Sequence, residues 1–255
     1  MTIGIIGTGA IGQYVAQALA DQGLGPAVHL VRTVRDGGAA QVTDVASLPA
    51  DVTLMVECAG HGALAQHGPA ILARGIDLVT VSVGALADPA LEDALTRAAT
   101  DGGAQLHLAS GAIGALDCLS AARVGGLREV VYTGRKPPRG WAGSPAEAVL
   151  DLAALEAPAT HFEGSARAAA VHYPKNANVA AAVALAGCGF DDTRVRLIAD
   201  PGVTANIHEV TAHGVFGTFS FRIEGVALPD NPRSSALAAM SVVAAITRRR
   251  AAITV

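Results

Sequence analysis

The chain has 255 residues, of which 51% are hydrophobic, 16% charged and 4% aromatic. This balance excludes an intrinsically disordered chain, which combines low hydrophobicity with high charge. A net charge of −4, from 18 Lys and Arg against 22 Asp and Glu, excludes a simple basic nucleic-acid binder. No run approaches the roughly 18–20 apolar residues of a membrane-spanning helix, and the first apolar run ends at Gly7 and predicts a strand, not a signal peptide. We therefore expect a cytoplasmic protein of one or two domains that binds neither membranes nor nucleic acid.

In the first 110 residues, apolar runs of strand length alternate with helical segments. Strands are predicted at 1–6, 27–31, 51–58, 77–83 and 104–109, and helices at 10–21, 62–74 and 87–100. Strands that are apolar at nearly every position and separated by helices indicate a parallel sheet covered on both faces. This pattern predicts an α/β fold, with a doubly wound Rossmann domain over residues 1–110.

The pattern changes after residue 110. Helices are predicted at 113–123, at 144–155 behind a capping box of Ser144 and Glu147, and on either side of Pro174; strands are predicted at 127–133, 160–167, 194–199, 205–212 and 218–226. The last three strands are separated by short Gly-containing turns, which favours antiparallel pairing. We predict a second, α+β catalytic and dimerisation domain with a mixed or antiparallel sheet over residues 111–233. Residues 231–234 are predicted to cap a final helix at 235–247, and residues 234–255 are expected to pack back on the first domain.

The sequence between the first strand and the first helix matches GxGxxG. In such a turn the first glycine permits the tight bend, the second lets a pyrophosphate approach the backbone, and the third allows close packing of helix on strand. The helix N-terminus adds free N–H groups. A plain glycine turn is the alternative. The predicted dinucleotide-binding residues are Gly7, Thr8, Gly9, Ala10, Ile11 and Gly12.

No acid directly follows the second strand, where a ribose-binding carboxylate is expected. The segment there begins with Arg32, and Arg35 lies close behind it. Either arginine could bind the 2′-phosphate of NADP, which favours NADP or use of both cofactors, whereas two solvated arginines are the alternative. FAD is a further dinucleotide that a GxGxxG turn can bind, but no other feature of the sequence supports it.

Other strand ends and one helix start carry further candidates. Ala59 follows the third strand and Ala112 follows the fifth, at the sheet edge where ligands bind. The segment 173–178, YPKNAN, places a cation and two amides at a helix start, which suits an anion or a carboxamide. Simple helix capping by asparagine is the alternative there.

The two histidines at 208 and 213 resemble a zinc-protease HExxH motif, but their spacing is one residue too long. On a strand, His208 and His213 would lie on opposite faces. Three widely spaced cysteines also form no CxxC pair, so we predict no metal site. On spacing alone, a structural role for His208 stays open.

Eight segments together resemble the L-aspartate dehydrogenase family along nearly the whole chain. The KNANVAA, NIHE and PDNPRSS motifs in this order are more specific than GxGxxG. The segments are GIIGTGAIG (4–12), VECAG (56–60), VSVGALAD (81–88), LASGAIGALD (108–117), TGRKPP (133–138), YPKNANVAAAVALAG (173–187), DPGVTANIHEV (200–210) and LPDNPRSS (228–235).

The resemblance implies a homodimer of Rossmann and α/β catalytic domains. It also implies oxidation of L-aspartate by NAD or NADP to iminoaspartate, which hydrolyses to oxaloacetate and ammonia or feeds NAD synthesis. By the same resemblance, His208 is the catalytic histidine, and Ala112 and Asn178 bind the nicotinamide cofactor.

A base with a pKa near neutrality suits this reaction, and an unperturbed histidine at about 6.5 would serve. The two carboxylates of aspartate need cationic or N–H donors. Lys175, one of only two lysines in the chain, is the first candidate, followed by Asn176 and Thr204. The competing hypotheses are an oxidoreductase of the homoserine dehydrogenase or dihydrodipicolinate reductase type and a non-catalytic NADH sensor.

Overall fold

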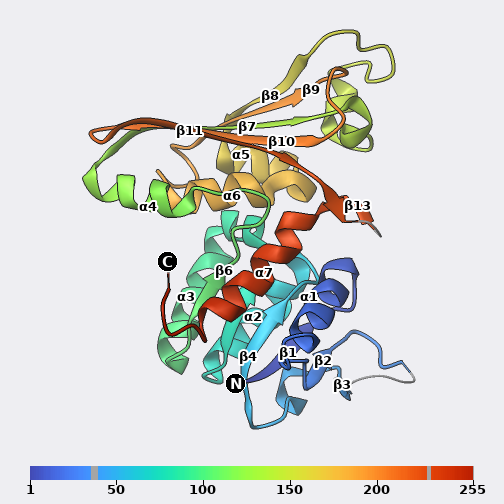
Figure 1. Ribbon diagram of the computed structural model, residues 1–255, viewed down its shortest axis with the longest axis vertical. Coiled ribbons are helices and arrows are strands. Elements are labelled where there is room, and N and C mark those ends of the chain that lie inside the picture. Colours follow the sequence, from blue (N-terminus) through green and yellow to red (C-terminus); the bar gives the residue numbers. More distant parts are fainter. Residues whose placement is uncertain (36–39, 229–230, 255) are drawn as a thin grey trace. The chain divides into compact units, whose positions relative to one another are not determined.

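The computed structural model describes residues 1–35, 40–228 and 231–254, without the side chains of Lys175 and of residues 231–233. The chain divides into two compact units. Unit 1 comprises Met1–Gly111 and Ala238–Val255, and unit 2 comprises Ala112–Leu237. Each unit has its own main sheet (Figure 1).

Unit 1 contains a parallel sheet in the order β3-β2-β1-β4-β5-β6. This order is that of a Rossmann fold, so the prediction of a doubly wound parallel sheet is confirmed. The short strand β3 was not predicted, and its three residues are exposed or half-buried. The strands are β1 (Thr2–Ile6), β2 (Val28–Leu30), β3 (Ala40–Val42), β4 (Val52–Glu57), β5 (Asp77–Thr80) and β6 (Leu106–Leu108).

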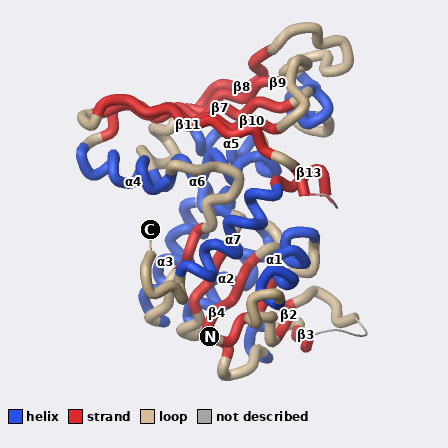
Figure 2. The backbone as a smooth tube through the Cα atoms, viewed as in Figure 1, coloured by secondary structure: helices blue, strands red, loops and turns tan. Residues whose placement is uncertain are grey.

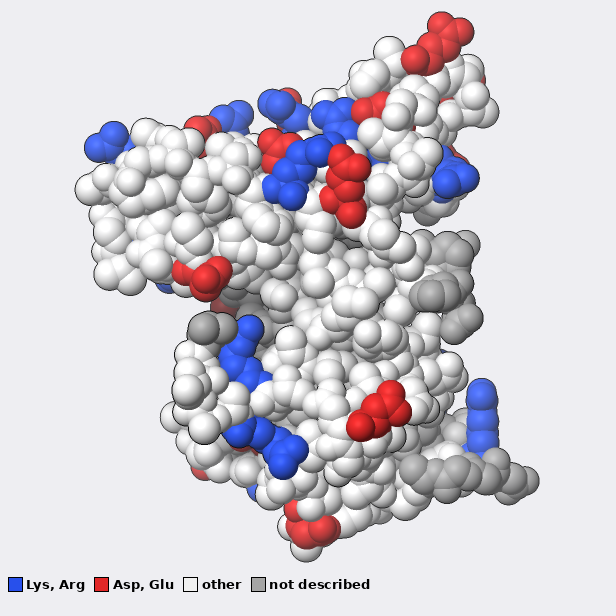
Figure 3. Space-filling view, viewed as in Figure 1, with Lys and Arg blue, Asp and Glu red and all other residues white. Residues whose placement is uncertain are grey.

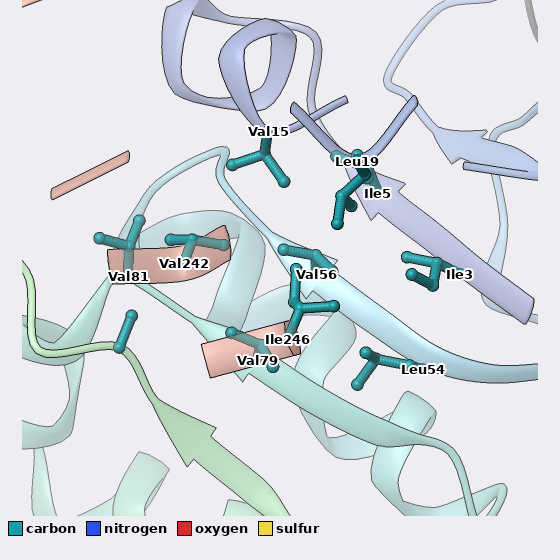
Figure 4. Close-up of a cluster of buried hydrophobic side chains, with 11 residues drawn as sticks. Ile3, Ile5, Val15, Leu19, Leu54, Val56, Val79, Val81, Val242 and Ile246 are labelled. Atoms are coloured by element: carbon teal, nitrogen blue, oxygen red, sulfur yellow. The ribbon is translucent and has the colours of Figure 1, made fainter. Parts of the chain in front are cut away.

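The core of unit 1 lies between this sheet and two helices that are distant in sequence. Val15 and Leu19 of α1 and Val242 and Ile246 of α7 pack against alternate apolar residues of β1, β4 and β5 (Figure 4). On the opposite face, a Cβ on Gly68 of α2 would lie 2.7 Å from Leu95 of α3, so these two helices pack closely. The helices are α1 (Ala10–Ala20), α2 (His61–Ala73), α3 (Pro89–Gly102) and α7 (Ala236–Arg248), with 3₁₀ turns η1 (Val45–Ser47) and η2 (Val83–Ala87).

Unit 2 contains a mixed sheet in the order β11-β10-β7-β9-β8, and helices α4, α5 and α6 cover one face of it (Figure 2). The prediction of an α+β unit with a mixed sheet is confirmed. β10 and β11 pair antiparallel as predicted, but β7 separates β9 from β10 and runs parallel to β9. The elements are α4 (Leu116–Gly125), β7 (Leu127–Lys136), β8 (Ala159–Ser165), α5 (Ala166–His172), α6 (Ala177–Ala186), β9 (Arg194–Ala199), β10 (Asn206–Gly214) and β11 (Gly217–Gly225).

Alternation along these strands separates a helix-covered face from a charged face. The charged face carries ion pairs such as Arg194 with Glu129 at 3.2 Å and Arg196 with Glu163 at 2.6 Å. On the side of unit 2 that Figure 3 shows, acidic and basic side chains are mixed, and the described residues form no continuous basic area there.

One predicted helix and one predicted helix cap are wrong. The capping box at Ser144 begins only a 3₁₀ turn, η4 (Pro145–Ala148), because the Asp151 side chain accepts the N–H groups of Ala153 and Ala154 at 3.1 and 3.2 Å and so competes with a helix. Residues 231–235 form strand β13 (Asn231–Ser235), which pairs with β12 (Ala227–Leu228). The last helix therefore begins at Ala236.

Candidate active site

The glycines of the GxGxxG turn in unit 1 have two roles: Gly7 and Gly12 allow close backbone contacts, and Gly9 leaves open space at the start of α1. Gly7 has φ +92°, and a Cβ there would lie 2.8 Å from the Cβ of Ala59. A Cβ on Gly12 would lie 2.7 Å from the carbonyl oxygen of Gly7. Gly9 faces open space and caps α1 without a side-chain hydrogen bond. Open space at a free helix N-terminus fits a bound pyrophosphate.

The ends of three strands meet around this turn. Gly7 N–H donates to the carbonyl of Leu30, the last residue of β2, at 3.1 Å, and Cys58 N–H donates to the carbonyl of Ile6, the last residue of β1, at 3.1 Å. The strand order reverses between β1 and β4, which is where doubly wound sheets bind ligands. Thr8, Ala10 and Ile11 lie in the same turn and the first turn of α1, and exposed Arg32 lies just beyond β2.

A buried carboxylate missed by the sequence reasoning fixes the neighbouring loop. Glu57 accepts the N–H groups of Ala59 and Gly60 at 2.6 and 2.7 Å, and it accepts the Thr80 hydroxyl at 2.6 Å. Gly60, at φ +103°, completes the bend. These bonds hold Ala59 against Gly7. Burial and the charge of Glu57 raise the pKa of the Cys58 thiol, so Cys58 stays protonated and is a poor nucleophile.

In unit 2, β10 places His208 on the helix-covered face of the sheet. His208 is only 6% exposed, and its Nδ1 lies 2.8 Å from the Tyr132 hydroxyl of β7. Gly134, opposite His208 in the ladder, makes room for this hydroxyl, because a Cβ there would lie 2.8 Å from it. His213 is exposed and contacts Thr218, so the two histidines lie on opposite faces as predicted.

The last residue of β7 brings a cation to the same face. The Nζ of Lys136 donates to the Asn176 side-chain oxygen in η5 (Pro174–Asn176). It also lies 4.9 Å from the ring centroid of Trp141 in η3 (Pro138–Trp141). Asn176 was predicted as a substrate-binding residue, whereas the sequence assigned no role to Lys136.

A second buried histidine lies beside Trp141. The His161 and Trp141 ring centroids are 4.4 Å apart, and His161 Nδ1 lies 3.0 Å from the Tyr173 hydroxyl. The other ring nitrogen, Nε2, has no hydrogen-bond partner within the described part of the chain. No sequence motif pointed to His161, because it lies in the middle of β8 without a recognisable neighbour.

Burial and charge set the protonation of this cluster. Burial, followed by the charge of Lys136, lowers the pKa of His208 to about 4. The same two causes lower the pKa of His161 to about 4. Burial lowers the pKa of Lys136 to about 8. The premise of an unperturbed histidine is therefore wrong, since His208 is neutral at neutral pH in the free protein.

The remaining predicted residues are more scattered. Ala112 is buried, and Asn178 is partly buried on α6 and has an interaction partner. Thr204 is exposed in the turn before β10. The side chain of Lys175 lies outside the described residues.

Both halves of the chain match known protein families. Residues 117–249 match the family model "Aspartate dehydrogenase, C-terminal", and residues 7–109 match "Homoserine dehydrogenase, NAD binding domain". An L-aspartate dehydrogenase of Ruegeria pomeroyi is 56% identical over 98% of this chain and 93% of the relative. The chain belongs to the aspartate dehydrogenase family.

Two further comparisons agree with membership in the aspartate dehydrogenase family. An L-aspartate dehydrogenase of Ralstonia pickettii is 48% identical over 99% of both chains. The crystal structure of aspartate dehydrogenase from Thermotoga maritima superposes with a TM-score of 0.79 at 28% identity, covering 100% of this chain and 99% of that one. The homoserine dehydrogenase model covers the nucleotide-binding half alone, so that alternative is not favoured. No helix within the described ranges is long and apolar enough to cross a membrane.

Proposed function

We propose that this protein catalyses the NAD(P)-dependent oxidative deamination of L-aspartate, with His208 as the general acid and base. The product is iminoaspartate, which water converts to oxaloacetate and ammonia. The observation that carries the proposal is the buried His208–Tyr132 pair at 2.8 Å, in the half of the chain that matches the aspartate dehydrogenase model. A buried histidine held at one ring nitrogen presents the other for proton transfer.

The turn of unit 1 suits the cofactor. Gly9 and the free N-terminus of α1 would hold the pyrophosphate. Gly7, Gly12 and Ala59 have no bulky side chain, so the turn can pack closely and keep this position open. Arg32, exposed beyond β2, would accept a 2′-phosphate, which allows NADP beside NAD. Ala112 and Asn178 would contact the nicotinamide end. When bound, the nicotinamide accepts the hydride from the substrate Cα.

The proton steps fall to His208. The substrate ammonium must lose a proton as the carbon–nitrogen double bond forms, and the attacking water must lose another. Each transfer needs the Nε2 lone pair, which exists when Nδ1–H donates to the Tyr132 oxygen. His208 must therefore release the first proton to solvent before it accepts the proton of the attacking water, and it can return that second proton to the departing ammonia. Burial raises the pKa of the Tyr132 phenol, so Tyr132 stays neutral and serves as a fixed hydrogen-bond partner.

The proposal extends to the organisation of the protein. Unit 1 would be the dinucleotide-binding domain and unit 2 the catalytic domain. We infer a cytoplasmic homodimer, since unpaired cysteines suit a reducing compartment and the family resemblance implies a dimer. Sedimentation equilibrium would test the dimer.

An absorbance assay at the nicotinamide band tests the function. L-aspartate should reduce NAD, NADP or both, while homoserine and D-aspartate should give no signal above background. Comparable rates with homoserine would favour the related oxidoreductase, and binding of NADH without turnover of any amino acid would indicate a sensor.

A further inference from the structure

Lys136 carries a charge that no carboxylate balances within the described part of the chain. Its partners are the amide oxygen of Asn176 and the face of Trp141, with Nζ 4.9 Å from the ring centroid. Both partners stabilise an ammonium group and hold it in place, but neither carries a negative charge that would neutralise it. The ammonium group is thus prepared for an anion that the chain itself does not supply.

Neighbouring cations do not share this arrangement. Arg135 forms an ion pair with Asp200 at 2.6 Å. Arg139, three residues further on, is exposed to solvent. Lys136 alone among these three is enclosed by other side chains and has no acid beside it in the described residues.

The position of Lys136 places it with the reacting histidine. Lys136 follows Gly134 by two residues, and side chains at this spacing lie on one face of a strand. Gly134 pairs with His208 across the ladder. Lys136 Nζ also lies 4.9 Å from the ring centroid of Trp141, which is 4.4 Å from that of His161, and the charge of Lys136 lowers the pKa of His161 and of His208.

Lys136 is partly buried, and even partial burial of an ammonium group without a counter-charge is unfavourable compared with an apolar side chain of similar length. Close by, His161 leaves Nε2 without a partner in the described residues. An uncompensated charge and an unsatisfied ring nitrogen around one indole ring are expected where a polar ligand completes the site.

We propose that Lys136 binds a carboxylate group of the substrate and that Asn176 and Trp141 position its ammonium group for this contact. The inference rests on the proposed function, because aspartate is the dicarboxylate concerned. An ion pair here would fix the substrate beside His208. It would also neutralise the charge that helps lower the pKa of His208, so substrate binding would shift that histidine toward the range in which a general base works at neutral pH.

The variant Lys136→Met removes the charge and keeps most of the side-chain volume, and Arg139→Met is the matched control. With saturating cofactor, the KM for L-aspartate should rise roughly 30-fold or more in Lys136→Met, and the inhibition constant of succinate should rise in parallel. The Kd of NADH should change less than about twofold, and Arg139→Met should behave as the unmodified protein. The Tm of Lys136→Met should not fall, because a partly buried charge without a counter-charge is removed.

A binding measurement separates this inference from the role of His208. Trp141 is the only tryptophan in the chain, so intrinsic fluorescence reports on the group beneath Lys136. Succinate should change the fluorescence in a saturable way, in the unmodified protein and equally in His208→Ala. Should His208→Ala stay active, the proposed role of His208 would fail while this titration would still test Lys136, and the proposed function itself would fail only if L-aspartate gave no reduced nicotinamide.

Three results would overturn the inference. The first is a succinate inhibition constant within about threefold of the unmodified value in Lys136→Met. The second is a kcat reduced roughly 100-fold with unchanged succinate binding, which would make Lys136 a proton carrier. The third is a lowered Tm with unchanged KM, which would make it structural. If Lys136→Met does not fold, Lys136→Gln provides the same comparison.

Discussion

The two units form their functional ends from different parts of the chain. In unit 1, the turn after β1 offers backbone N–H groups and empty space, and its residues lie within six positions of one another, Gly7 to Gly12. In unit 2, the corresponding features are side chains from separate elements, such as Tyr132 and His208, which are 76 positions apart. The site in unit 1 is formed by backbone groups, so added side-chain atoms should disrupt it. The site in unit 2 is formed by side chains, so it should depend on their charge and hydrogen bonds.

The largest effect is expected at His208. The variant His208→Ala should lower kcat by roughly 10²–10⁴ because it removes the proton acceptor, while the Kd of NADH stays within about twofold. His213→Ala, on the opposite face of the same strand, is the control and should keep normal turnover. Stopped-flow or steady-state assays with L-aspartate measure both, and near-normal turnover of His208→Ala would remove the assignment.

Tyr132 should have a smaller effect on the same step. Tyr132→Phe removes the hydroxyl that holds Nδ1, so kcat should fall roughly tenfold as the ring loses its orientation and tautomer. A ¹⁵N NMR spectrum of the histidine should show a changed tautomer ratio. Unchanged kcat together with an unchanged spectrum would show that Tyr132 only fills space.

In unit 1, a single methyl group added at Gly7 should weaken cofactor binding. Gly7→Ala places a Cβ 2.8 Å from that of Ala59 at φ +92°, and such strain costs about 1–3 kcal/mol. The Kd of NADH should weaken accordingly, by roughly tenfold. Gly23→Ala, at φ +71° with no atom within 4 Å, is the control and should change stability without changing the Kd. Equal NADH affinity in both variants would contradict a backbone site.

The effect that is smallest at neutral pH is a dependence of stability on pH. Folding lowers the pKa of His208 and of His161 to about 4, so the unfolded chain binds more protons between that pH and about 6.5. The free energy of unfolding should therefore fall as pH drops through this window, by at most about 1.4 kcal/mol per pH unit for each histidine. Urea unfolding should show a shallower slope for His208→Gln; an identical slope would argue that His208 is not buried.

The same contrast explains how much could be predicted from sequence. The parallel sheet, the GxGxxG turn and the place of Ala59 follow from local periodicity and glycine spacing, and the structure bears out the fold. The cluster in unit 2 has no local signature. Lys136, His161 and Tyr132 come together only because β7 lies between β9 and β10, an order that the sequence did not indicate. His208 itself was suggested by family resemblance.

Local competition explains the remaining errors. The segment after Ser144 has a helix-start pattern, but the Asp151 side chain accepts the N–H groups of Ala153 and Ala154 and so competes with a helix beyond the 3₁₀ turn. Residues 231–235 look like a helix cap, yet they pair with β12. The lowered pKa of His208 depends on burial and then on the charge of Lys136, neither of which can be predicted from the residues next to His208 in the sequence.

The central claim is that this protein oxidises L-aspartate at its Cα. The most direct measurement is mass spectrometry of the reduced cofactor after turnover of L-aspartate that carries deuterium at Cα. We predict one deuterium in the reduced nicotinamide and a rate slowed by the label. Unlabelled reduced nicotinamide, or deuterium released to water, would contradict the account.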